Sequence, residues 1–247
     1  MALKKNLLSI VQEILSDLDS EDVGSIQDTL EAMQVAQIVE TTFYNIISTR
    51  DIPEHKELIK LTADSDSEYP THFTLDDNVK RIEKLWYDAS SDASKEYKEV
   101  RWCDPLDFIS RSDAYRSDYV AVIDKNAGTT IRVGTNKDPE YYTTFDDNNI
   151  VMNSYDNTKD SSLQESKVRA YGYVYPIFNK TLDTYVPDLD ASMFPYLIAE
   201  AKSVAFSVLK GGVDQKIEQA AKRQKSYVQN DMDRILTPNQ RPMYGRS

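Results

Sequence analysis

The sequence predicts an α+β protein in which both ends of the chain form a four-helix bundle, with an inserted antiparallel β-rich domain and an extended C-terminal tail. The hydrophobic period changes from helical to alternating near Pro53 and becomes helical again after Pro187. Helices at the two ends of one chain can bury their apolar stripes by packing together. The expected segments are two N-terminal helices in 1–54, the β-rich domain in 55–187, a C-terminal helix pair in 188–235 and the tail in 236–247.

Two amphipathic helices are expected before the β-rich domain. In the first, over residues 5–18, leucine, isoleucine and valine recur at helical spacing. The second follows a polar break at 19–24 and begins at a sequence with the character of a capping box, Ser25 to Asp28. It ends before Pro53, because proline disfavours helical backbone in the residue that precedes it.

Short β-rich runs separated by polar turns fill the middle of the chain. The alternation of side chains is strongest in 167–175, which contains Tyr171, Tyr173 and Tyr175. We interpret these tyrosines as cross-strand pairs, and contact between subunits is the alternative. One helical turn interrupts the strands at 104–109, with Asp104 as its cap.

After Pro187 two more helices are expected. The first has a broad apolar stripe from Phe194 to Leu209 and is closed by a pair of glycines. The second begins at Asp214 and has a thinner stripe that continues to Ile235.

The C-terminal part of the chain differs in charge from the rest. Residues 202–247 carry nine Lys or Arg and four Asp or Glu, a charge of +5, whereas residues 1–201 carry −17. The tail cannot bury a core of its own, so we expect it to dock on another protein. Arginine and tyrosine concentrate binding energy, and proline lowers the entropy lost on docking. The expected docking residues are Pro238, Arg241, Pro242, Tyr244 and Arg246.

No catalytic or metal-binding constellation stands out. The two histidines, His55 and His72, lie in polar sequence, and we expect both on the surface or on an edge strand. Cys103 has no histidine partner nearby in the sequence and is expected to be a semi-buried structural thiol. The acidic run 64–68 lacks the glycine and glutamate of a calcium loop.

Motifs for nucleotide binding and hydrolysis are also absent from the sequence. We therefore expect no enzyme activity, no cofactor and no metal. No apolar run is long enough for a bilayer, which predicts no membrane contact.

The order of these elements resembles that of head-to-tail adaptor proteins of tailed bacteriophages, of the tail tubular protein A type. The resemblance rests on the opening residues 10–15 and 23–29, the long helix with 36–39 and Phe43-Tyr44, the β-rich middle, the late helix with 196–202, and the arginine-bearing tail. It implies a structural virion protein of the neck or tail, made in the host cytoplasm. Such adaptors form a ring, commonly of twelve subunits, that connects the portal protein to tail or nozzle proteins.

An acidic body suits a DNA exit channel, because like charge lets DNA pass without specific binding. Two alternatives stay open. One is a different β-rich tail or baseplate protein. The other is a carbohydrate-binding or hydrolytic module that uses the tyrosine-rich sheet and acidic turns, which predicts carboxylates that converge in a deep pocket.

Overall fold

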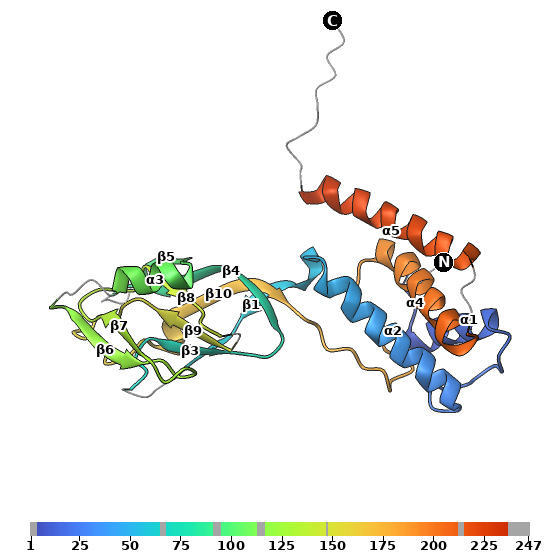
Figure 1. The fold of residues 1–247 in the computed structure, drawn as a ribbon, viewed down its shortest axis with the longest axis horizontal. Coiled ribbons are helices and arrows are strands. Elements are labelled where there is room, and N and C mark those ends of the chain that lie inside the picture. Colours follow the sequence, from blue (N-terminus) through green and yellow to red (C-terminus); the bar gives the residue numbers. More distant parts are fainter. Residues whose placement is uncertain are drawn as a thin grey trace, which may run out of the picture. The chain divides into compact units, whose positions relative to one another are not determined.

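The computed structural model describes residues 4–64, 68–90, 95–112, 117–146, 148–211 and 215–236. The chain forms two compact units (Figure 1). A helical unit combines Met1–Glu54 with Pro176–Ser247, and a β-rich unit comprises His55–Tyr175. Residues 176–187 thus belong to the helical unit.

The helical unit contains four α-helices within its described residues. They are α1 (Leu7–Asp17), α2 (Leu30–Ser48), α4 (Phe194–Leu209) and α5 (Gln215–Leu236). Helices α1, α2 and α4 pack against one another. Their apolar stripes are fully buried at positions such as Ile14 on α1, Phe43 on α2 and Leu197 on α4.

The expected four-helix bundle is wrong. The helices α1, α2 and α4 form a three-helix core, whereas the main packing partner of α5 is α4. Among residues 215–229 of α5, the buried side chains are Ala221 and Val228. A stripe this thin offers too little apolar surface to pack against three helices at once, so α5 lies on the outside of the core.

Helix α2 begins later than the sequence indicated. Its N-cap is Thr29, whose Oγ1 accepts a hydrogen bond of 3.1 Å from the amide of Ala32. The Asp28 carboxylate instead accepts hydrogen bonds from the amides of Gly24 (2.8 Å) and Ser25 (2.7 Å). The residues 25–28 therefore form a separate turn before the helix, because Asp28 bonds backward along the chain.

The β-rich unit is built on an eight-stranded sheet with the order β1-β10-β4-β5-β8-β9-β3-β2. Its strands are β1 (Lys56–Ile59), β2 (Leu61–Ala63), β3 (His72–Leu75), β4 (Val79–Asp88), β5 (Tyr97–Trp102), β8 (Tyr141–Thr143), β9 (Asn149–Met152) and β10 (Val168–Val174). Strand β2 also contacts β10, so the sheet is nearly closed on itself. A separate two-stranded ribbon pairs β6 (Tyr119–Ile123) with β7 (Thr130–Gly134).

The expected purely antiparallel domain is also wrong, because β5 and β8 pair in parallel. The chain between them passes through α3 (Pro105–Ser112) and the β6–β7 ribbon. A connection of this length allows the parallel pairing that a short hairpin forbids. Helix α3 itself confirms the helical turn expected after Asp104, whose Oδ1 accepts a 2.9 Å hydrogen bond from the amide of Leu106.

The inner face of the sheet carries the core of the β-rich unit. Across four neighbouring strands, Ile59 pairs with Ala170, Ala170 with Leu85, and Leu85 with Val100. All four are buried, together with Phe73, Ile150 and Met152 on the other half of the sheet. Since side chains alternate along a strand, the flanking residues point to the outer face.

The outer face is covered over only one half of the sheet. Val151 on β9 packs there in a second core with Phe108 of α3 and with Val122, Ile131 and Val133 of the β6–β7 ribbon. Among the described residues, the half formed by β1, β10, β4 and β5 has no extensive packing with α3 or the ribbon. We call the outer face of these four strands the open half-sheet.

Gly172 on β10 tests how closely these strands approach. A β-carbon at this position would lie 2.1 Å from the carbonyl oxygen of Arg81, next to a bulge between Tyr171 and Gly172. Gly172→Ala should therefore lower the free energy of unfolding of the β-rich unit by about 3 kcal/mol, since the backbones must separate. Both tryptophans lie in this unit, so fluorescence in a urea titration reports its unfolding.

The control for this change is Gly128→Ala. Gly128 has a φ of +64°, but nothing lies within 4 Å of an added β-carbon. Only the left-handed conformation is then penalised, at about 1 kcal/mol. Equal losses in the two variants would contradict the close approach at Gly172.

Candidate functional site

The docking residues expected from the sequence lie outside the part of the chain that the structure describes. They are Pro238, Arg241, Pro242, Tyr244 and Arg246. The expected cap of α5, Asp214, also lies outside it. Two other surfaces emerge that the sequence analysis did not single out, namely the flanks of α5 and the open half-sheet.

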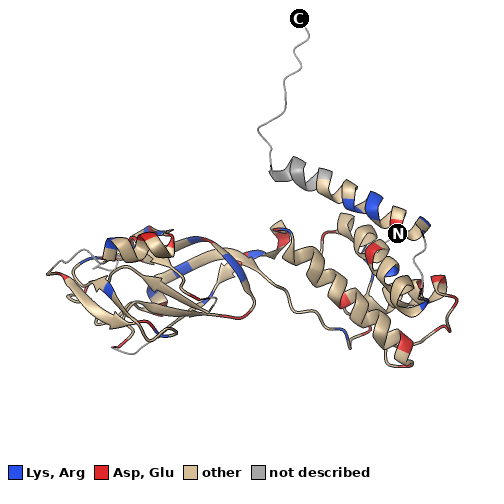
Figure 2. Ribbon diagram, in the orientation of Figure 1, with Lys and Arg blue, Asp and Glu red and all other residues tan. Residues whose placement is uncertain are grey.

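Helix α5 is the basic element of the helical unit. Residues 215–236 contain five Lys or Arg and three Asp or Glu. Figure 2 shows Lys and Arg along the described part of this helix, and Asp and Glu on α1 and α2. One ion pair of 2.7 Å joins Lys222 to Glu218 one turn earlier, and Arg223 and Lys225 are exposed to solvent.

A hollow opens on each side of α5, and each has a volume of about 590 Å³. The α1-side hollow is mainly apolar and is lined by Phe194, Ile198, Ala199, Lys202, Ile217 and Ala220, with α1 at its edge. The α2-side hollow is more polar and is lined by Ile46, Arg50, Tyr196, Glu200, Lys225 and Gln229. Helix α5 therefore has partly exposed apolar surface on one flank and mixed surface on the other.

Lys202 neutralises the acidic side of the α1-side hollow. Its ammonium group lies 2.7 Å from Glu13 and 2.7 Å from Asp17, which ties α4 to α1. Burial alone would raise the pKa of Glu13, but hydrogen bonds from Lys202 and Lys5 outweigh it and hold the pKa below its usual range. Burial alone would lower the pKa of Lys202, but hydrogen bonds and charge interactions with Asp17 and Glu13 outweigh it and raise the pKa. The hollow is thus bounded by compensated charges.

The open half-sheet carries cations laid over aromatic rings. The register aligns Lys56 with Tyr173 and Arg81, Leu58 with Tyr171 and Lys84, and Arg169 with Trp86 and Glu99. Lys56 and Arg81 each lie 5.2 Å from the Tyr173 ring centre, and Arg169 lies 4.0 Å from that of Tyr97. Tyr173 is buried, and Lys56 and Arg81 lie over its ring.

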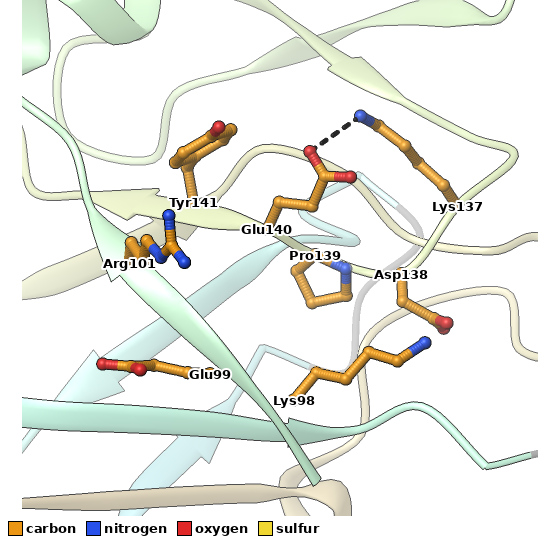
Figure 3. A pocket seen from close by; sticks show the side chains of 8 residues that line it. All are labelled: Lys98, Glu99, Arg101, Lys137, Asp138, Pro139, Glu140 and Tyr141. Carbon is orange, nitrogen blue, oxygen red and sulfur yellow. Dashed lines mark hydrogen bonds and ion pairs between the residues drawn. The ribbon is translucent and has the colours of Figure 1, made fainter. Parts of the chain in front are cut away.

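A charged pocket of about 490 Å³ lies where the open half-sheet meets the start of β8 (Figure 3). It is lined by Lys98, Glu99, Arg101, Lys137, Asp138, Pro139, Glu140 and Tyr141. Each carboxylate is held by a lysine: Glu99 by Lys84, Asp138 by Lys159 at 2.9 Å, and Glu140 by Lys137 at 3.2 Å. The backbone amide of Arg101 donates a 2.9 Å hydrogen bond to the carbonyl oxygen of Glu140, but its guanidinium makes no ion pair or hydrogen bond with any residue of the described ranges.

Both histidines are buried, so their expected surface or edge positions are wrong. His72 is 1% exposed on β3, which lies between β9 and β2 rather than at an edge. Its Nε2 is 3.8 Å from Asp124 Oδ1, and neither ring nitrogen has a hydrogen-bond partner among the residues described. Asp124 belongs to the turn of the β6–β7 ribbon, about fifty residues away, so no local pattern could predict this burial.

Burial lowers the pKa of His72 below its usual value. The neighbouring carboxylates of Asp124 and Asp64 oppose this effect, and Lys125 adds to it. No group of three or more His, Cys, Asp or Glu side chains in the described ranges is arranged to hold a metal ion. Cys103, expected to be semi-buried, is buried in the second core, and this burial raises the pKa of its thiol.

Comparison with protein-family models gives no match, and none of the curated proteins matches the sequence. Among the helices that the structure describes, none combines the length and the hydrophobicity that crossing a bilayer requires.

The buried imidazole predicts a specific pH dependence. The unfolded chain holds the His72 proton at a pKa of about 6.5, and the folded chain holds it more weakly. The folded β-rich unit should therefore lose stability as the pH falls from about 6.5 through the folded pKa. Urea titrations between pH 5 and 7.5 should show this loss, and His72→Gln should make the dependence less steep.

The pKa of His72 in the folded protein can be measured directly from its proton resonances. In His55→Gln, His72 is the only histidine, so its ring signal needs no further assignment. Its titration midpoint should lie below 6.5. A midpoint at or above 6.5 would show that the carboxylates outweigh burial and would contradict the prediction.

Proposed function

We propose that this chain is a structural virion protein that forms a ring and acts as a head-to-tail adaptor. In this role it connects a portal protein to tail or nozzle proteins and lines the channel through which DNA leaves. The resemblance of the sequence supports the proposal, and the open hollows on the two flanks of α5 are the observation that carries it.

The hollows are suited to contact with another protein. Helix α5 packs on α4 and leaves side chains such as Ile217 and Ala220 at the wall of an open, mainly apolar cavity. Exposed apolar surface next to compensated charges is typical of protein–protein contact sites. A neighbour that inserts apolar side chains there would complete the packing that α5 lacks.

A second copy of this chain is the occupant that the charges favour. Residues 202–247 carry +5 and residues 1–201 carry −17, so the basic end of one copy is complementary to the acidic body of another. The two contact surfaces lie on different parts of the chain. Such head-to-tail contacts close into a ring when the rotation between copies allows it. A ring of twelve is the number that the resemblance implies.

The acidic body also suits the passage of DNA. With a net charge of −12, most of the surface repels phosphate, and sliding DNA would meet few groups that hold it. This reading needs no enzyme activity, cofactor or metal.

The assembly can be tested at the α1-side hollow. Ala220 is an exposed residue of α5 that lines this hollow, whereas its neighbour Gln219 is exposed but does not line it. Ala220→Arg places a charged side chain in the contact and should convert the ring to monomers in native mass spectrometry. Gln219→Arg adds the same charge on the same helix and should leave the ring intact. A wild-type chain that stays monomeric at tens of micromolar would refute the ring.

The tail can be tested by truncation after Ile235. We expect it to dock on the portal, so the truncated protein should keep its thermal unfolding temperature and its ring but lose attachment to isolated heads. The matched comparison is the full chain carrying alanine at Arg241, Tyr244 and Arg246, which should show the same loss. Normal attachment by the truncated ring would eliminate the tail as the docking arm.

A further inference from the structure

The open half-sheet gathers five cations from four strands of the sheet. Lys56, Arg81, Lys84, Arg101 and Arg169 project from its four strands. The exposed carboxylates among them are Glu83 and Glu99, which pair with Lys56 and Lys84. This face is therefore positive in a chain whose net charge is −12. Figure 2 shows the Lys and Arg positions along β4 and β10.

Two arginines of this face, Arg101 and Arg169, are exposed, and neither forms an ion pair within the ranges that the structure describes. The charge of Arg101 contributes to the lowered pKa of Glu99, whose carboxylate is bound by Lys84. Arginine at such a position presents a planar fork of N–H donors that matches phosphate. The ring of Tyr97, 4.0 Å from the Arg169 guanidinium, helps to hold that fork in place before any ligand arrives.

Aromatic rings lie between the cations. Trp86 and Tyr171 are half-buried on the same face, at the registers of Arg169 and Lys84. Four strands about 4.8 Å apart give a face roughly 14 Å across, on which a flexible strand meets several cations and both rings. Proteins bind single strands by stacking unpaired bases on aromatic rings and by placing cations next to the phosphates. Half-exposed rings among cations suit such a ligand.

We propose that the open half-sheet binds single-stranded nucleic acid, with Arg101 and Arg169 contacting phosphates and with Trp86 and Tyr171 stacking on bases. A single strand is favoured over a duplex because a duplex keeps its bases away from a flat protein face. The acidic charge of the remaining surface does not prevent this contact, since charges beyond about 8 Å are largely screened at physiological salt. The inference does not rest on the adaptor function.

The test measures the fluorescence anisotropy of a labelled 20-nucleotide oligothymidine with the full-length chain between 25 and 200 mM NaCl. Contact with three to four phosphates predicts a slope of about −2 to −3 in log affinity against log salt. Arg101→Gln combined with Arg169→Gln should weaken binding at least tenfold at 50 mM NaCl and make the slope shallower by about 1.4. Replacing both arginines with lysine should largely retain the slope.

The matched control is Lys222→Gln combined with Arg223→Gln on α5, which removes the same charge from the other basic surface. It should leave the affinity for the oligonucleotide unchanged, and circular dichroism should show that both double variants keep the wild-type melting temperature. Equal losses in the two double variants would place the binding outside the sheet and overturn the proposal.

Three further results distinguish the ligand. In a Trp102→Phe background, bound oligothymidine should quench the fluorescence of Trp86, the remaining tryptophan. Polyglutamate that competes as well as oligothymidine at equal charge would assign the face to an acidic protein and overturn the proposal. A duplex of equal length that binds more tightly than the single strand, or no binding at all at 25 mM NaCl, would overturn it as well.

Discussion

The β-rich unit depends on one constraint, the burial of a row of apolar residues across four adjacent strands. Because Ile59, Ala170, Leu85 and Val100 face the core, every residue next to them in sequence must face outward. A slip of one residue in β10 would turn Ala170 to solvent and bury Arg169. The core thus keeps the arginines, the tyrosines and Trp86 on one surface. Gly172 extends this constraint, since its missing side chain lets β10 and β4 approach through the bulge.

The helical unit obeys a different limit, the amount of apolar surface that each helix carries. Phe194, Leu197, Ala201 and Ala205 give α4 a broad buried stripe, and α4 contacts α1, α2 and α5. Among residues 215–229 of α5 the buried side chains are Ala221 and Val228, whereas α4 buries more and larger apolar residues. The main packing partner of α5 is α4. The hollows on its flanks follow from this imbalance. A helix that packs mainly on one neighbour in its own chain keeps flanks that a second chain can cover.

Local patterns predicted the elements better than their assembly. The helical period predicted α1, α4 and most of α2. The Asp-Pro pair predicted α3, and the alternation of side chains predicted β10. Each of these signals lies within about twenty residues of sequence. One local contact was missed, because Asp28 bonds backward to the amides of Gly24 and Ser25 and so shifts the start of α2. Two other features required contacts that no local pattern contains: the ribbon covers His72 from about fifty residues away, and the long crossover through α3 makes the β5–β8 pair parallel. The expected bundle was wrong because periodicity shows where the apolar stripe of a helix lies. It does not show how many other helices the stripe is large enough to pack against.

The two candidate surfaces also differ in whether the sequence alone could predict them. The basic C-terminal region is contiguous, so counting charges along the chain was enough to find it. The positive face of the sheet has members at positions 56, 81, 84, 101 and 169, all within the segment whose sum is −17. The net charge of that segment does not reveal these cations, whereas the pairing register of the strands places them on one face. Since charges interact over a Debye length of about 8 Å, a partner responds to the local arrangement and not to the sum. An acidic chain can therefore present two basic surfaces, one formed by sequence and the other formed only by the fold.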